Sequence, residues 1–166
     1  MITAEDVVAD ARTYLGAPYK LGGRSPEAFD CVGLALLVAN DFGANWQFEM
    51  PGIDPDSSIA WENVNRALQE FRLQQIEVTD SRIGDLVIVR RPLGGAGTVK
   101  IISGLGGMAS FFGVSKFIHF RDPTFLQESG ITVDDMIGIR RELKCDMQTF
   151  VKRLWKFYRY PFVETA

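Results

Sequence analysis

An aspartate followed by a cysteine introduces the most apolar stretch of this chain. Asp is a preferred N-cap residue, and an apolar run of this length fits a helix that is buried on most of its surface. Gly43 marks the predicted end of that helix. The sequence therefore predicts a buried helix with Cys31 in its first turn, directly after Asp30. The apolar residues of the run are Val32, Leu34, Ala35, Leu36, Leu37, Val38 and Ala39.

Cys31 is the first candidate for chemistry. A cysteine at a helix N-terminus lies near the positive end of the helix dipole and near free backbone N–H groups, and both favour the nucleophilic thiolate. The charge of Asp30 opposes this effect. Position alone leaves a second interpretation open, in which Cys31 is a small apolar residue of the core.

The remaining pattern places helices first and strands afterwards. Thr3 and Asp6 form a capping-box pattern, which predicts a helix that ends at Gly16 and is followed by a loop over residues 17–29. The apolar face of this helix comprises Val7, Val8, Ala11, Tyr14 and Leu15. A third helix is predicted over 58–72, short strands over 75–79, 84–90, 99–103, 116–121 and 136–141, and a final helix, capped by Asp146, over 147–159. This order indicates an α+β fold.

Composition excludes several classes of function. A net charge of −3 argues against a general nucleic-acid binder, and no apolar run approaches the ~20 residues that cross a bilayer. Two cysteines and one histidine cannot make a four-ligand structural zinc site without carboxylates, and no cofactor is expected. Cys31 and Cys145 are far apart in sequence, which favours two free thiols over a disulfide. The first residues lack the features of a signal peptide.

Two segments together resemble the NlpC-type cell-wall cysteine peptidases, which are papain-like endopeptidases. Residues 14–23 read Tyr-Leu-Gly-Ala-Pro-Tyr-Lys-Leu-Gly-Gly, and residues 29–34 read Phe-Asp-Cys-Val-Gly-Leu. The family pattern is a Leu-Gly-x-Pro-Tyr-x-x-Gly-Gly loop, followed by Asp-Cys-Ser-Gly-Leu at the start of a helix. Further along, residues 83–88, 116–120 and 138–141 are similar to three strands of the family.

The resemblance implies a nucleophile helix packed on an antiparallel sheet. It covers a peptidase-like domain over residues 1–142 and leaves 143–166 as a basic, aromatic, helical extension. The family cleaves peptide bonds of cell-wall stem peptides. By this resemblance Cys31 is the nucleophile, while Tyr19 and Asp30 line the substrate site.

The sequence departs from the family at the general base. The histidine that begins the family's His-Val-Gly-Ile strand is matched here by Thr98, which cannot take a proton from a thiol near neutral pH. His119, the one histidine of the chain, matches the third site residue, which normally orients the base. Two interpretations stay open: a degenerate site, or an active peptidase in which His119 serves Cys31 as base.

Two segments are candidates for contact with protein partners. Residues 140–166 carry seven basic and three acidic residues and many aromatics, and residues 104–115 form an apolar, glycine-rich insertion. The Asp-Cys-Val-Gly-Leu motif resembles the branch of the family found in bacteriophage tail tips. With no signal peptide recognised, the resemblance implies a phage or prophage tail-tip protein. Such a protein would be cytoplasmic during assembly and then part of the virion, with tail proteins bound through 144–166 and 104–115.

Overall fold

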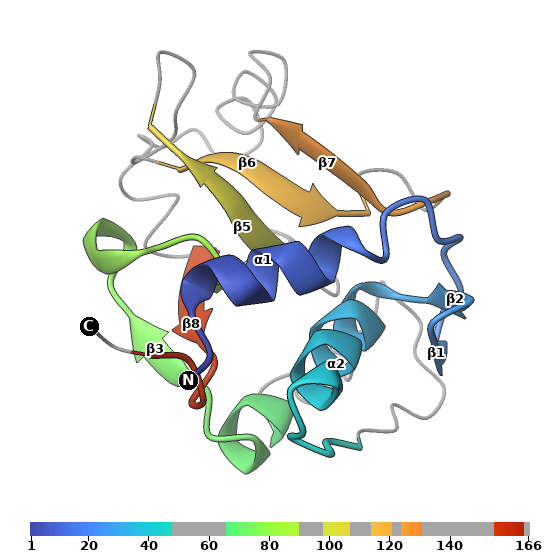
Figure 1. Cartoon of the computed structure of the whole chain (residues 1–166), viewed down its shortest axis with the longest axis horizontal. Helices are drawn as coiled ribbons and strands as arrows, with labels where there is room; N and C mark the ends of the chain where they lie inside the picture. The colour runs from blue at the N-terminus through green and yellow to red at the C-terminus, as the bar shows by residue number, and fades with distance from the viewer. Residues whose placement is uncertain (48–65, 90–97, 107–113, 121–123, 131–154, 165–166) are drawn as a thin grey trace, which may run out of the picture.

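The computed structural model describes residues 1–47, 66–89, 98–106, 114–120, 124–130 and 155–164. Six strands of this part form one sheet in the order β3-β8-β4-β5-β6-β7, in which every neighbouring pair is antiparallel. The predicted α+β class is confirmed (Figure 1). The elements are α1 (Ala4–Arg12), β1 (Arg24–Ser25), β2 (Ala28–Phe29), α2 (Cys31–Asp41), β3 (Gln74–Ile76), a 3-10 turn (Val78–Asp80), β4 (Leu86–Val89), β5 (Thr98–Leu105), β6 (Val114–His119), β7 (Gln127–Gly130) and β8 (Trp155–Arg159).

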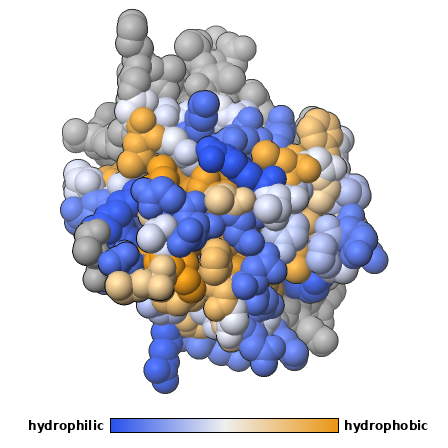
Figure 2. Space-filling view, viewed as in Figure 1, coloured by the Kyte–Doolittle hydropathy of each residue, from blue (hydrophilic) through white to orange (hydrophobic). Residues whose placement is uncertain are grey.

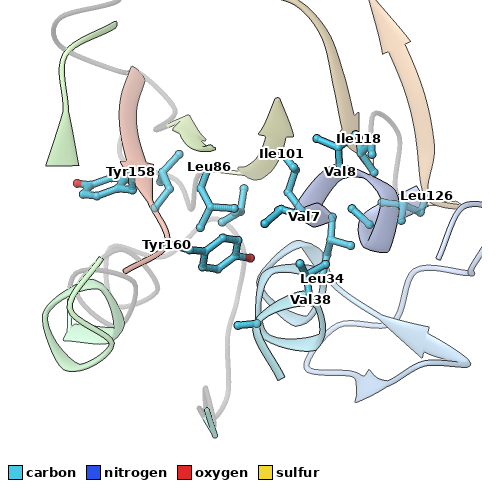
Figure 3. Close-up of a cluster of buried hydrophobic side chains, with 14 of the residues drawn as sticks. Val7, Val8, Leu34, Val38, Leu86, Ile101, Ile118, Leu126, Tyr158 and Tyr160 are labelled. Atoms are coloured by element: carbon cyan, nitrogen blue, oxygen red, sulfur yellow. The ribbon is translucent and has the colours of Figure 1, made fainter. Parts of the chain in front are cut away.

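The two long helices cover one face of the sheet, and the main core lies between them and the strands (Figure 3). Val7 of α1 and Leu34 of α2 are fully buried there and meet side chains from the middle of the sheet, such as Ile101. Truncation of a fully buried leucine such as Leu34 to alanine costs about 2–5 kcal/mol. The core therefore fixes α2, and with it the cysteine at its first position.

The N-terminal helix begins as predicted and ends earlier. Thr3 and Asp6 form the reciprocal capping box. The helix stops at Arg12 instead of continuing to Gly16, because the chain turns toward β7 and the Gly16 N–H donates to the carbonyl of Leu126. As a result Leu15, predicted on the buried face, is exposed.

The predicted final helix is wrong for residues 155–159, which form β8 between β3 and β4. Its aromatic side chains are buried in the sheet, and Tyr160 directly after it donates a hydrogen bond to the Ala35 carbonyl of α2 at 2.7 Å. Trp155, Phe157, Tyr158 and Tyr160 therefore belong to the interior and are not anchors for a partner protein. Residues 147–154 and Cys145 lie outside the described part.

Other predictions are confirmed with shifted ends. Residues 66–70 are helical, within the predicted 58–72, and the strands predicted over 75–79, 84–90, 99–103 and 116–121 correspond to β3, β4, β5 and β6. The predicted strand 136–141 lies outside the described residues. β5 extends to Leu105 and β6 starts at Val114, so the apolar insertion 104–115 is strand at both of its ends.

A buried ion pair fastens β8 to the residues before β4. The Arg159 guanidinium donates from Nε and Nη2 to the two carboxylate oxygens of Asp85, each at 2.8 Å. Arg159 Nη2 also donates to the Asp80 carbonyl at 3.0 Å, and the Arg82 N–H donates to Asp85 at 2.7 Å. The paired hydrogen bonds between the Arg159 guanidinium and the Asp85 carboxylate explain why a basic residue is tolerated in a buried strand.

The surface carries mixed polar and apolar side chains. Figure 2 shows hydrophilic residues spread over one face, with smaller apolar areas between them. Large apolar side chains that are exposed include Leu15, Leu21, Leu105 and Phe125. Within the described residues, no helix is long and apolar enough to span a membrane.

Candidate functional site

Asp30 organises the entrance to α2. Asp30 is 3% exposed, and its carboxylate accepts hydrogen bonds from the Gly33 N–H, the Gly22 N–H and Arg24 Nη1, each at 2.8 Å. The first of these bonds caps the helix, as the sequence predicts. The other two attach the glycine-rich loop to the same carboxylate. Asp30 therefore joins the loop before β1 to the first turn of α2.

Two glycines allow this loop to press against the helix. A Cβ atom on Gly33 would lie 2.5 Å from the Gly23 carbonyl oxygen, and one on Gly23 would lie 2.5 Å from the Ala28 carbonyl oxygen. Both distances are far below van der Waals contact with backbone atoms that cannot move aside. Gly23 and Gly33 are therefore required by close backbone packing, whereas Gly22 has open space around it and a positive φ of 74°, which favours glycine.

Cys31 is the first residue of α2 and lies against the start of β5. Burial is the largest effect on its thiol, and the charge of Asp30 acts in the same direction, so the pKa rises to about 11. Backbone N–H groups of Val99, Val32 and Cys31 itself lower the pKa without compensating for these effects. A raised pKa favours the protonated thiol at neutral pH over the nucleophilic thiolate.

Tyr19 lies beside the same group of residues. It forms an isolated bridge with Phe29, and its ring packs edge-on against Phe120 with centroids 5.1 Å apart. Burial is the main reason why the pKa of its hydroxyl rises to about 12, and the charges of Cys31 and Asp30 raise it further. The structure thus brings Tyr19, Asp30 and Cys31 together.

Arg24 is a member of this site that the sequence analysis did not identify. Its Nη1 atom bonds to Asp30 and to the Gly23 carbonyl, at 2.8 and 2.7 Å. Its charge also lowers the pKa of Tyr19, against the larger opposing effects. The signal was available, because a buried aspartate needs a cationic or N–H partner and Arg24 follows the glycine pair directly.

Thr98 is the first residue of β5, and its backbone pairs with that of Val89 in β4. The backbone N–H of the next residue, Val99, lowers the pKa of the Cys31 thiol. The start of β5 therefore lies next to the cysteine, and the position at which the resemblance places a histidine base holds a threonine.

His119 is the last residue of β6, and its side chain is buried, with 5% exposed. Its Nε2 atom lies 2.7 Å from the Ser129 hydroxyl of β7. The neighbours Ile118 and Phe120 belong to the core beside α2, whereas the His119 ring lies 5.9 Å from that of Phe117. Because strand side chains alternate between faces, His119 points to the face of the sheet away from α2. Among the described residues, the neighbouring groups that shift the pKa of the Cys31 thiol are the Asp30 carboxylate and backbone N–H groups.

In the described part of the chain, no group of three or more His, Cys, Asp or Glu side chains is placed to hold a metal ion. The side chains that the fold brings together around the first turn of α2 are the Cys31 thiol, the Tyr19 phenol, the Asp30 carboxylate and the Arg24 guanidinium.

No protein-family model and no curated protein matches the chain. Several solved structures do match it. The NlpC/p60 domain of the peptidoglycan hydrolase SagA is 25% identical, with a TM-score of 0.50, over 78% of this chain and 90% of that one. An NLP/P60-family protein from Staphylococcus aureus, similar to a lipoprotein, is 21% identical over 98% of this chain, with a TM-score of 0.52. NlpC1 from Trichomonas vaginalis is 19% identical over 95% of this chain, with a TM-score of 0.51.

These similarities define the fold. The chain has the fold of NlpC/p60 domains, in which a helix packs on an antiparallel sheet. It spans 42% of the Staphylococcus protein and 44% of the Trichomonas protein, so it corresponds to one part of each.

Proposed function

We propose that this chain is a phage or prophage tail-tip protein with an NlpC-type peptidase fold, in which the site binds cell-wall peptides and cleaves them poorly or not at all. The observation that carries the proposal is the surroundings of the Cys31 thiol. Cys31 is partly buried beside the Asp30 carboxylate, and the strand next to it starts at Thr98. A cysteine nucleophile needs a neighbouring base or a lowered thiol pKa, whereas burial raises the pKa of Cys31.

Recognition of a peptide is better supported than cleavage. Tyr19 and Arg24 place a phenol and a guanidinium beside Asp30, and the structural neighbour SagA is a peptidoglycan hydrolase. Loss of general-base catalysis slows a reaction by about 10²–10⁴-fold and leaves binding groups in place. A peptidase fold that has lost its base therefore retains what it needs to bind wall peptides.

The tail-tip assignment rests on resemblance. The Asp-Cys-Val-Gly-Leu motif of residues 30–34 is similar to the phage-tail branch, with Val32 where wall peptidases carry serine. Leu105, at the end of β5, is 48% exposed. An exposed apolar side chain at this position supports a contact surface at the apolar insertion 104–115. Because the aromatics of β8 are buried, contacts of the segment 144–166 with tail proteins have to come from its other residues.

The proposal is tested by the pH dependence of Cys31 alkylation with iodoacetamide in a Cys145→Ser background. We expect a slow reaction near neutral pH that accelerates only toward pH ~11, and the same profile in a His119→Ala variant. Cys31→Ala is the control for labelling at other residues. Release of peptides from purified peptidoglycan is measured in parallel.

The competing function is an active endopeptidase in which Cys31 works with His119. A thiolate that forms well below pH ~8.5 and is lost in His119→Ala, together with peptide release that stops in Cys31→Ala, would establish that function and overturn the degenerate site. A Thr98→His variant provides the positive control. A histidine restored there should lower the apparent thiol pKa if the start of β5 is the base position.

A further inference from the structure

A serine and the one histidine of the chain form a hydrogen-bonded pair on the face of the sheet away from the helices. His119 ends β6, Ser129 lies in β7, and the two strands are neighbours in the sheet (Figure 1). His119 Nε2 lies 2.7 Å from Ser129 Oγ. Both side chains come from one antiparallel strand pair, whose register places Ser129 opposite Phe117, so the backbone holds the two groups together.

Strand geometry separates this pair from the site at the first turn of α2. Glu128, directly before Ser129, accepts hydrogen bonds from Arg12 of α1 at 3.0 to 3.3 Å, so its side chain lies on the helix side of the sheet. Because strand side chains alternate between faces, Ser129 points to the opposite side, where the His119 ring also lies. The two sites are therefore on different faces of the sheet.

An aromatic ring and an ammonium group lie around the pair. The Phe117 and His119 rings have centroids 5.9 Å apart, and Lys100 Nζ of β5 lies 5.3 Å from the centroid of Phe117. His119 and Phe117 are buried, whereas Ser129 and Lys100 are partly exposed. The imidazole is thus held in place beside an apolar ring, while the hydroxyl and the ammonium group can be reached from solvent.

A hydroxyl within hydrogen-bond reach of an imidazole is the arrangement that activates a serine as a nucleophile. We propose that Ser129 and His119 form a second reactive site, a serine nucleophile with its base, which accepts the acyl group of short esters. Lys100 supplies a positive charge on the same face, and acyl transfer develops an anionic oxygen that such a charge stabilises. This inference does not depend on the proposed function.

The reaction follows the usual order of acyl transfer to a hydroxyl. Ser129 Oγ attacks the acyl carbon, and its proton moves to His119 Nε2. The bond between the acyl carbon and the leaving alcohol then breaks, and the alcohol takes the proton from Nε2. A water molecule, with His119 again as base, releases the acyl group from the serine, so the products are a carboxylic acid and an alcohol. The Phe117 ring beside the pair favours small apolar acyl groups.

The tautomer of His119 distinguishes this role from a structural hydrogen bond. A base has to accept the serine proton at Nε2, so the ring proton lies on Nδ1. In the other tautomer Nε2 donates to Ser129 Oγ, and the serine is not activated. Because the chain has one histidine, nitrogen-15 NMR of the full chain reports its tautomer without any variant. At about pH 8, where an ordinary imidazole is neutral, we expect the proton on Nδ1.

A fluorophosphonate probe, which reacts with activated serines, tests the nucleophile. We expect it to label the wild-type chain at Ser129, identified by peptide mass spectrometry, and we expect p-nitrophenyl acetate to acetylate the same residue. Ser129→Ala should abolish the label, and His119→Gln should slow labelling by about 10²–10⁴-fold, the usual contribution of a general base. Ser115→Ala, which changes a partly exposed serine of β6, is the matched control and should retain the rate.

Two results on the wild-type chain would overturn the proposal. Labelling of Ser129 no faster than that of Ser115 would mean that the hydroxyl is not activated. A proton on Nε2 would mean that the pair is structural. Neither result needs a variant, so a folding defect in His119→Gln cannot obscure it. The pH profile of Cys31 alkylation is a separate measurement, so failure of the proposed function and failure of this inference are distinguishable.

Discussion

Replacement of Asp30 by asparagine separates two roles of this carboxylate, one in stability and one in the chemistry of the thiol. The carboxylate accepts three hydrogen bonds at 2.8 Å, from Gly33, Gly22 and Arg24. Asparagine has the same shape but only one acceptor oxygen. If that oxygen faces Gly33 and Arg24, the amide NH₂ group faces the Gly22 N–H, and two donors meet.

The magnitude follows from these contacts. One buried backbone donor without an acceptor costs about 1–3 kcal/mol, and the loss of charge in the contact with Arg24 adds about 1 kcal/mol. We therefore expect Asp30→Asn to lower the free energy of unfolding by about 2–4 kcal/mol. The same change removes a negative charge beside the sulfur atom, so the pKa of Cys31 should fall from about 11. Burial, the larger cause, remains.

The assay is urea unfolding followed by tryptophan fluorescence, combined with the pH profile of Cys31 alkylation in the Cys145→Ser background. Glu27→Gln is the matched control, because Glu27 is an exposed acid in the same loop; it should change stability by less than about 0.5 kcal/mol. Equal stability of Asp30→Asn and Glu27→Gln would refute the role of Asp30 as the link between loop and helix. An unchanged thiol profile would refute its effect on Cys31.

Three further substitutions test the framework around the site by urea or thermal unfolding. Arg159→Met leaves the Asp85 carboxylate buried without its cation and should cost about 3–5 kcal/mol, whereas the double variant with Asp85→Leu should recover part of the loss. Gly33→Ala forces a Cβ toward the Gly23 carbonyl and should cost about 1–3 kcal/mol; full stability would show that the loop moves freely. Tyr160→Phe removes a hydrogen bond to a backbone carbonyl of α2 and should cost about 1 kcal/mol, and no loss would mean that water replaces the hydroxyl.

The short-range features of this fold were predictable from the sequence. The capping box of Thr3 and Asp6 and the N-cap of Asp30 are bonds between residues three positions apart. Such bonds depend on local geometry alone, so residue type and spacing identify them. The NlpC-type fold was predicted from the resemblance of the motifs around Cys31 to that family, and two glycines of these motifs, Gly23 and Gly33, are ones that close packing requires.

The C-terminal strand shows where local pattern fails. Aromatic residues close together at 155–160 fit one face of a helix, and they also fit a strand that is buried on both faces. A short apolar segment does not distinguish the two periods. In the folded protein this segment is strand β8, because its backbone pairs with β3 and β4. The Asp85 carboxylate also provides a partner for the Arg159 side chain.

The sequence by itself determined that a cysteine begins a buried helix directly after its capping aspartate, and that threonine stands where the resemblance expects a base. Only the tertiary structure decided what surrounds the sulfur atom. The Val99 N–H of β5 lowers the pKa of the thiol, while His119 hydrogen-bonds to Ser129 on the other face of the sheet. These contacts join residues far apart in the chain. They are fixed by strand register and by the alternation of side chains across the sheet, which a one-residue shift would reverse.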